Sequence, residues 1–343
     1  MARHINIPIF IPHEGCNNAC VFCNQRTITG VRERADRDIR PEIDRALGTY
    51  EGGCEDAEIA FFGGSFTGID RKTMVKLLET AYSYIRDGKV SSIRLSTRPD
   101  YIDEEILDIL KAHGVTAIEL GLQSMSDKVL LESKRGHTAE TSEKACLLIK
   151  EYGFELTGQM MIGLPGSTGE DELHTAEKIA DMKCDCARIY PTVVFEDTEL
   201  CEMARRGDYE PLTVEEAIER SVGVYEIFVR RNVKLLRIGL QSTEALVRGD
   251  GIYAGANHSA LGELIEGEYY YRLLSKKLAD IRGDGETLII KCAPGEESKI
   301  AGQKKKNKVR LLQNAEAVGL KIRNVRIIAD KNVPKNDADI KVV

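Results

Sequence analysis

The sequence predicts an α/β fold in which six strand–helix units curl into a partial barrel and a small α+β domain follows. Between residues 5 and 231, apolar runs of strand length alternate six times with amphipathic stretches of helix length. Beyond about residue 240 this alternation fades. Alternating strands and helices form a parallel sheet with right-handed crossovers. We therefore predict a partial TIM-like (β/α)6 barrel in residues 1–240 and a second domain in residues 241–343.

The predicted elements of the barrel follow one another in chain order. Two helix starts resemble capping boxes, in which side chains satisfy the free N–H groups of the first turn: Ser167-x-x-Glu170 and Thr213-x-x-Glu216. Strands are predicted at residues 5–11, 57–62, 93–96, 116–122, 155–162 and 187–194. Helices are predicted at residues 39–47, 70–86, 103–113 and 140–152, and from the two capping boxes to about residues 182 and 231.

The second domain is small and basic. Residues 271–343 contain 17 Lys and Arg against 9 Asp and Glu, a net charge of +8, which leaves −15 for residues 1–270. A basic appendage on an acidic body is typical of contact with a polyanion, although a solvated helix face explains most charge runs. Its elements are predicted as a helix at 257–281, a strand at 287–292, a basic helix at 296–316 and a strand at 321–328, with a frayed end after residue 330.

The composition is that of an ordinary soluble protein, with 343 residues of which 42% are hydrophobic and 30% charged. No apolar run approaches the ~20 residues that span a bilayer, and residues 1–5 lead into the first strand without a signal peptide. Nine cysteines, three of them clustered, fit a reducing compartment better than a disulfide framework. We therefore expect a cytoplasmic protein without membrane contact.

Three cysteines in the loop after the first strand carry the first chemical signal. Cys16, Cys20 and Cys23 have the spacing C-x3-C-x2-C. Three thiolates can hold three irons of a 4Fe-4S cluster and leave the fourth open for a substrate, whereas an electron-transfer cluster normally has four cysteines. The alternative is a Cys3His zinc site that includes His13, but structural zinc sites usually pair two separated ligand clusters.

Glycine-rich and polar segments follow the other predicted strands at their carboxyl ends, where (β/α) barrels carry their functional groups. They are Gly63-Gly64-Ser65, residues 96–100, Gln123-Ser124, residues 163–166 and Tyr190-Pro191. With Phe22 directly before the last cysteine, the cysteine loop resembles the signature of the radical SAM superfamily. This resemblance implies a 4Fe-4S cluster on the three cysteines, with S-adenosylmethionine (SAM) chelating its fourth iron.

The same resemblance implies an external low-potential electron donor and cleavage of SAM to methionine and a 5′-deoxyadenosyl radical. The Gly63-Gly64-Ser65 turn is expected to hold the methionine amino group, and its alternative is a plain turn before a helix. Arg98 can pair with a carboxylate, and its alternative is a surface salt bridge with Asp100. Glu119 and Gln123 can accept hydrogen bonds from ribose hydroxyls. Tyr190 can donate a hydrogen bond to the ligand or pack on it.

Several segments resemble more closely the radical SAM domain of the Elongator catalytic subunit, whose relatives modify the wobble uridine of tRNA. They lie, in family order, at residues 96–100, 119–124, 135–138, 160–166 and 188–192. The sequence departs from that family in two ways. Only about 100 residues follow the barrel, so we expect no acetyltransferase domain, and the cysteine spacing is the compact form of the superfamily.

The sequence therefore predicts a radical SAM enzyme that modifies tRNA or another RNA. The basic segment at residues 299–310, with Lys304-Lys305-Lys306, is the candidate RNA contact, and a solvated helix is its alternative. Two other functions remain open. One is a radical SAM enzyme for a small molecule, similar to oxygen-independent coproporphyrinogen oxidase. The other is a non-catalytic, metal-bearing RNA-binding protein. The sequence identifies no catalytic acid, base or relay residue.

Overall fold

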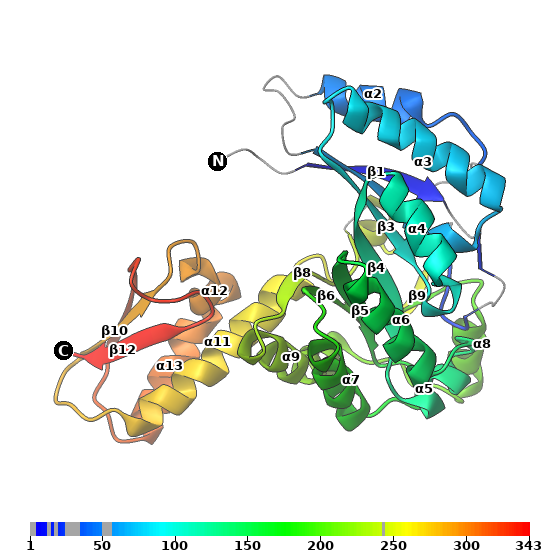
Figure 1. Cartoon of the computed structure of the whole chain (residues 1–343). Coiled ribbons are helices and arrows are strands. Elements are labelled where there is room, and N and C mark those ends of the chain that lie inside the picture. The colour runs from blue at the N-terminus through cyan, green and yellow to red at the C-terminus, as the bar shows by residue number, and fades with distance from the viewer. Residues whose placement is uncertain (1–4, 12–14, 17–19, 25–34, 50–56, 242–243) are drawn as a thin grey trace. The chain divides into compact units, whose positions relative to one another are not determined.

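The computed structural model describes residues 5–11, 15–16, 20–24, 35–49, 57–241 and 244–343. The chain divides into two compact units (Figure 1). The first unit contains Met1–Leu212 and Val233–Gly255, and the second contains Thr213–Asn232 and Ala256–Val343. The domain division predicted after residue 240 stays a prediction.

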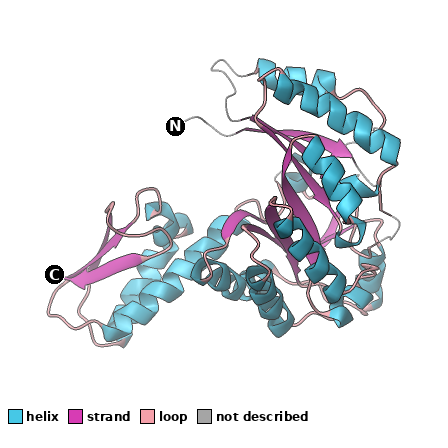
Figure 2. Ribbon diagram, in the orientation of Figure 1, coloured by secondary structure: helices cyan, strands magenta, loops and turns pink. Residues whose placement is uncertain are grey.

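A sheet of parallel strands forms the centre of the first unit (Figure 2). Seven strands pair in the order β1-β2-β3-β4-β5-β6-β8. They are β1 (Ile5–Ile11), β2 (Ala57–Gly63), β3 (Ser92–Thr97), β4 (Val115–Gln123), β5 (Glu155–Ile162), β6 (Cys186–Pro191) and β8 (Lys234–Ile238). Because all of these strands run in the same direction, their carboxyl ends meet at one edge of the sheet.

Helices lie along the outer face of the curved sheet (Figure 2). The helices of this unit are α2 (Arg40–Gly48), α3 (Arg71–Arg86), α4 (Glu104–Ala112), α5 (Asp127–Glu132), α6 (Ala139–Glu151), α7 (Gly169–Asp181), α8 (Glu199–Arg206) and α10 (Glu244–Arg248). Gly158 of β5 faces α7, because a Cβ at this position would lie 3.0 Å from Ile179. Its neighbour Gln159 therefore points to the opposite, concave face, since side chains alternate along a strand.

The partial (β/α) barrel predicted from the sequence is confirmed. All six predicted strands are present and pair in chain order, and β8 adds a seventh to the β6 edge. The predicted strand at 187–194 is divided in two. Its second part is β7 (Val193–Phe195), which pairs antiparallel with β9 (Ile252–Gly255) in a separate two-stranded sheet.

One of the two predicted capping boxes lies one residue later than predicted. Helix α7 is capped by Thr168 and Asp171, whose side chains bond each other's backbone N–H groups. The predicted pair began at Ser167, but the backbone N–H of Ser167 closes a turn onto the carbonyl of Leu164 at 3.0 Å, so the helix starts after it. The capping box of Thr213 and Glu216 is confirmed.

The second unit contains a mixed three-stranded sheet in the order β11-β10-β12. Strand β10 pairs parallel with β11 and antiparallel with β12. The strands are β10 (Thr287–Cys292), β11 (Asn324–Ala329) and β12 (Ala338–Val342). The helices are α9 (Val214–Arg230), α11 (Leu261–Asp280), α12 (Glu297–Ala301) and α13 (Lys306–Ala317).

Two expectations for this unit are corrected by the structure. The basic helix predicted at 296–316 is broken at Gly302, whose φ is +69°. The amide of Asn307 fills the space beside Gly302 and donates to the carbonyls of Gly267 at 2.7 Å and Ile300 at 3.2 Å, which separates α12 from α13. The chain after Asp330 is also not frayed, because residues 338–342 form β12 and pair with β10.

Candidate functional site

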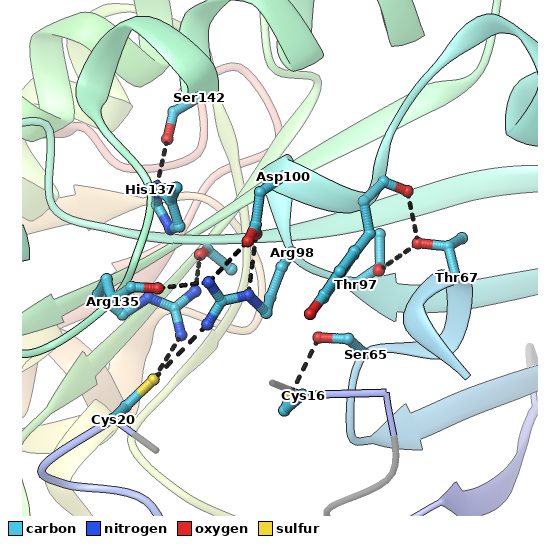
Figure 3. Close-up of polar contacts among 12 residues, drawn as sticks. Cys16, Cys20, Ser65, Thr67, Thr97, Arg98, Asp100, Arg135, His137 and Ser142 are labelled. Atoms are coloured by element: carbon cyan, nitrogen blue, oxygen red, sulfur yellow. Dashed lines mark hydrogen bonds and ion pairs between the residues drawn. The ribbon is translucent and has the colours of Figure 1, made fainter. Parts of the chain in front are cut away.

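The described part of the cysteine loop lies against the turn that follows β2. Gly15 has a φ of +75°, and a Cβ on it would lie 2.1 Å from the carbonyl oxygen of Ser65 and 2.7 Å from the backbone nitrogen of Ile69. Only a residue without a side chain fits this approach. The next residue, Cys16, has its sulfur 3.2 Å from the Ser65 hydroxyl (Figure 3). The loop after β1 and the turn after β2 are therefore in direct contact.

The second half of the loop is held by two other elements. The backbone N–H of Val21 donates to the Ser133 carbonyl at 3.3 Å, just after α5. The Val21 carbonyl accepts from the N–H of Leu200 at 2.8 Å, in the first turn of α8. The Val21 side chain is buried with Val194 and Leu200, and Phe22 packs against them. Helix α8, which the sequence analysis did not predict, is thus one of the supports of the cysteine loop.

Cys20 is buried and faces two arginine side chains (Figure 3). Arg135 Nη1 lies 3.1 Å from the Cys20 sulfur, and Arg98 Nη1 lies 3.8 Å from it. Arg98 comes from the turn after β3, and Arg135 from the segment between α5 and α6. Arg135 begins the Elongator-like segment at residues 135–138, but no local pattern reveals that its side chain reaches a cysteine 115 positions away.

Thiolates are the protein ligands that a 4Fe-4S cluster takes, and Cys16, Cys20 and Cys23 supply three of them. No group of three His, Cys, Asp or Glu side chains in the described ranges is close enough to hold one metal ion. A 4Fe-4S cluster takes one sulfur for each of three irons, so its ligands need not converge on one point. No disulfide joins the cysteines of the part described. His13, the fourth ligand of the zinc alternative, lies outside the described residues.

The predicted Gly63-Gly64-Ser65 turn lies beside the end of β1. Gly63 has a φ of +107°, and a Cβ on it would lie 3.2 Å from the backbone of Ile11. Ser65 is buried. The turn is fixed by Thr67, whose hydroxyl lies 2.6 Å from that of Thr97 and donates to the Tyr101 carbonyl at 2.8 Å. These contacts join the segments that follow β2 and β3.

Arg98 is buried rather than placed on the surface, and it pairs with Asp100. Its Nε and Nη2 donate to the two carboxylate oxygens of Asp100, each at 2.9 Å. A further hydrogen bond runs from Nη2 to the Arg135 carbonyl. Although burial opposes the charged form, the hydrogen bonds to Asp100 raise the pKa of Arg98 above its ordinary value. The surface salt bridge considered from the sequence is therefore an ion pair with a buried guanidinium.

Glu119 lies on the concave face and belongs to a network of charged side chains. Its carboxylate accepts from Arg188 Nη2 and from Gln159 Nε2, both at 2.7 Å, and Arg94 Nη1 is 3.7 Å away. Arg94 also pairs with Glu58 at 2.7 Å. The network joins β2 to β6 across the sheet. Both oxygens of Glu119 already accept hydrogen bonds, and its predicted contact with a ribose stays a prediction.

Gln123 offers an acceptor at the end of β4. Its φ is +66°, a left-handed conformation that is strained for a residue other than glycine. The register between β4 and β5 shifts at this point. Its Oε1 is buried and has no hydrogen-bond partner among the described residues. A buried acceptor without a donor is costly, so this oxygen fits a site completed by the hydroxyl of a ligand.

Two more side chains near the strand ends have shifted pKa values. Burial raises the pKa of Tyr190, and the positive charge of Arg188 opposes this effect. Burial and the charge of Arg135 together lower the pKa of His137 to about 4. The Nδ1 of His137 lies 3.3 Å from the Ser142 hydroxyl, and its Nε2 is buried without a partner in the described part of the chain (Figure 3).

Comparison with known proteins identifies the family of this chain. Residues 10–179 match the model of the radical SAM superfamily, and residues 184–271 match that of the Radical_SAM C-terminal domain. The chain therefore belongs to the radical SAM superfamily, whose members are enzymes that use a 4Fe-4S cluster and SAM. The predictions of the family, the enzyme class and the two cofactors are confirmed at this level.

Several curated relatives are of the Elongator type, and another is a putative methylthiotransferase of Methanocaldococcus jannaschii. The chain is 34% identical over 207 residues to the tRNA uridine(34) acetyltransferase of Methanocaldococcus jannaschii, covering 59% of this chain and 36% of that protein. It is 26% identical over 232 residues to Elongator complex protein 3 of Saccharomyces cerevisiae, covering 56% of this chain and 42% of that protein. The chain thus spans well under half of the length of either relative.

A solved structure supports the fold. The archaeal Elp3 of Methanocaldococcus infernus, with residues 1–46 deleted, superposes with a TM-score of 0.64 at 24% identity. The match covers 81% of this chain and 64% of that one. Within the described residues, no helix is both long and apolar enough to cross a membrane.

Proposed function

We propose that this protein is a radical SAM enzyme that modifies tRNA or another RNA. The observation that carries the first half of this proposal is the contact between the cysteine loop and the turn after β2. Gly15 and Cys16 touch Ser65, so the proposed cluster ligands and the proposed amino-group site lie side by side. The cluster, when bound, would pass one electron to SAM and so cleave it into methionine and a 5′-deoxyadenosyl radical.

The residues of the chain bind and orient SAM in this proposal. Gly63, Gly64 and Ser65 receive the methionine amino group, because the turn offers backbone without bulky side chains. The buried Oε1 of Gln123 accepts from a ribose hydroxyl. Glu119 and Tyr190 lie on the same concave side and complete the polar wall. An external low-potential donor would reduce the bound cluster. We also place the protein in the cytoplasm.

RNA as the substrate is supported by the relatives and by the charges of the second unit. Curated relatives carry the name tRNA uridine(34) acetyltransferase. Several cations of the second unit already have acidic partners, such as Lys299 with Glu266 at 2.9 Å and Arg310 with Glu268. The Lys304-Lys305-Lys306 turn is instead exposed, and no acidic side chain of the described residues pairs with it. Exposed lysines of this kind can contact several phosphates.

Salt-dependent retention of bulk tRNA tests the RNA contact. Replacing Lys304, Lys305 and Lys306 together by alanine should weaken retention and reduce the slope of log affinity against log salt by about one for each lost phosphate contact. The matched control replaces three other exposed lysines of the same unit by alanine. These are Lys321, Lys331 and Lys335.

Equal retention by the two triple variants would contradict a specific role for the turn. SAM cleavage by the reconstituted protein should also be stimulated by tRNA. Cleavage that proceeds without any effect of RNA would favour the small-molecule alternative. A brown, cluster-loaded protein that retains tRNA but never cleaves SAM would favour the non-catalytic one.

A further inference from the structure

Two arginine side chains converge on the sulfur of one cluster cysteine (Figure 3). Arg135 Nη1 is 3.1 Å from Cys20 Sγ, and Arg98 Nη1 is 3.8 Å from it. Cys16 has a different environment, since its sulfur contacts the neutral hydroxyl of Ser65 at 3.2 Å. Of these two cysteines, Cys20 is therefore the one that faces positive charge.

The two guanidinium groups are fixed in place by contacts on their other sides. Arg135 Nη2 donates to the carbonyl of Gly121 in β4 at 2.6 Å. Arg98 is held by both oxygens of Asp100 and by the carbonyl of Arg135. Both arginines are buried, with only 3% and 5% of Arg98 and Arg135 exposed. The fold therefore sets the positions of both guanidinium groups beside the sulfur, and neither group belongs to a mobile side chain on the surface.

A thiolate ligand at Cys20 would place a negative charge next to two buried cations. Two buried positive charges lie next to each other, and Asp100 is the one carboxylate of the described residues that pairs with either. A buried charge without a partner is strongly destabilising. Cysteine ligands of metals are deprotonated, so the sulfur of Cys20 supplies the second negative charge when the cluster is bound.

We propose that Arg135, supported by Arg98, is a positioning residue that donates to the Cys20 thiolate and makes the bound cluster easier to reduce. The proposal rests on the cluster-binding part of the proposed function. It gives Arg98 a role at the cluster in addition to the carboxylate contact predicted from the sequence. Arg135 has no role in SAM binding here, and its effect passes through Cys20.

The direction of the effect follows from charge. The reduced cluster carries one more negative charge than the oxidised cluster, so a neighbouring cation and an N–H···S hydrogen bond stabilise the reduced form more. Net charge and hydrogen bonds to the sulfurs are among the factors that set the potential of a cluster. Hydrogen bonds from charged donors are about twice as strong as neutral ones, and a buried site strengthens them further. Loss of Arg135 should therefore lower the midpoint potential.

A redox titration followed by EPR tests this inference on the whole chain of residues 1–343 after reconstitution. We expect Arg135→Gln to lower the midpoint potential by ~59 mV or more, which for one electron is a tenfold change in the ratio of oxidised to reduced cluster at a fixed potential. Arg135→Lys keeps the charge but lacks the planar guanidinium group that reaches Gly121 and Cys20 together. The midpoint potential of the cluster in this variant should therefore fall by less than in Arg135→Gln. The matched control is Lys134→Gln, which removes the same charge from an exposed neighbour that pairs with Glu199.

The outcomes separate this inference from the proposed function. A wild-type protein that binds no cluster would overturn the proposed function itself. A wild-type cluster whose midpoint is the same in Arg135→Gln, or falls equally in Lys134→Gln, would overturn only the role of Arg135. The midpoint does not depend on the fraction of loaded molecules, so partial loading does not obscure the result. If Arg135→Gln does not fold, Arg135→Lys decides, and a wild-type midpoint in that variant contradicts the inference.

Discussion

At the scale of single residues, Gly15 decides where the cysteine loop lies. A Cβ there would come within 2.1 Å of the Ser65 carbonyl oxygen. The contact is reciprocal, because a Cβ on Gly68 would lie 2.2 Å from the Gly15 carbonyl oxygen. Two glycines thus let two backbone segments touch directly. The position of Cys16 beside Ser65 depends on this approach.

Gly15→Ala should displace the cysteine loop and reduce cluster loading. The added methyl group cannot be accommodated by rotating a side chain, because its closest neighbours are backbone atoms. Iron and sulfide bound per chain after anaerobic reconstitution measure the effect. The matched control is Gly88→Ala, at a φ of +68° with nothing within 4 Å of the new Cβ. Loading that falls equally in both variants would show that backbone strain alone, and not the contact with Ser65, is responsible.

His137 is the residue whose charge state should be visible in the stability of the protein. Its pKa falls from an ordinary 6.5 to about 4 in the fold. Between these values the unfolded chain binds a proton that the folded chain does not, so the free energy of unfolding decreases as the pH is lowered through this range. The contribution is at most ~1.4 kcal/mol for each pH unit.

His137→Gln should therefore remove part of the pH dependence of stability. Urea unfolding at several pH values between 4 and 6.5 measures it, and the variant should lose less stability than the wild type on acidification. Parallel pH profiles of the two proteins would show that the imidazole does not titrate in this window.

Single site residues were predictable to different degrees. The place of the Gly63-Gly64-Ser65 turn after β2 was predictable because strand ends can be recognised in local sequence, while the ligand roles of the turn and of the cysteines stay predictions. Arg135 and its contact with Cys20 were not predictable, since they depend on how three distant segments meet. The buried ion pair of Arg98 was foreseen only in part, because the sequence does not show that the turn after β3 lies inside the site.

At the scale of elements, the charged network around Glu119 ties neighbouring strands together on the concave face. Glu119 of β4 accepts hydrogen bonds from Gln159 of β5 and Arg188 of β6. Arg94 of β3 reaches Glu58 of β2 as well. Because these groups are buried, the loss of one partner leaves a charge without its counterion.

Glu119→Gln should lower the free energy of unfolding by ~3 kcal/mol, the lower end of the cost of breaking a buried ion pair. Urea denaturation measures it. The matched control is Glu140→Gln, in an exposed pair with Lys144, which should change stability by no more than ~0.5 kcal/mol. Similar losses in the two variants would mean that the network contributes no more than a surface pair.

The elements of the barrel were predictable because hydrophobic residues repeat in its strands and helices with the clear periods of those structures. The capping box of α7 was placed one residue early because two overlapping patterns fit, and only the turn closed onto Leu164 distinguishes them. The basic helix was predicted as continuous because the residues on both sides of Gly302 are ones that are common in helices. Its break depends on the side chain of Asn307, which bonds distant carbonyls. Helix α8 and strands β7 and β9 are short and depend on tertiary packing.

At the scale of the whole molecule, the chain divides its chemistry between two units. The first unit holds Cys16, Cys20, Cys23 and the polar strand ends, and the second holds the whole basic tail, residues 271–343. The family assignment could be predicted because the cysteine spacing is specific. The substrate could not, because no pattern in the sequence states what faces the cofactor.

The measurement that tests the central claim most directly is SAM cleavage by the reconstituted protein. The protein is loaded anaerobically with iron and sulfide, reduced with dithionite and supplied with SAM, and 5′-deoxyadenosine is quantified. The variant with Cys16, Cys20 and Cys23 all replaced by alanine is the control. We predict a brown wild-type protein that forms 5′-deoxyadenosine and a colourless variant that forms none. A fully loaded wild-type protein that forms no 5′-deoxyadenosine, or a triple variant that forms as much, would contradict the account.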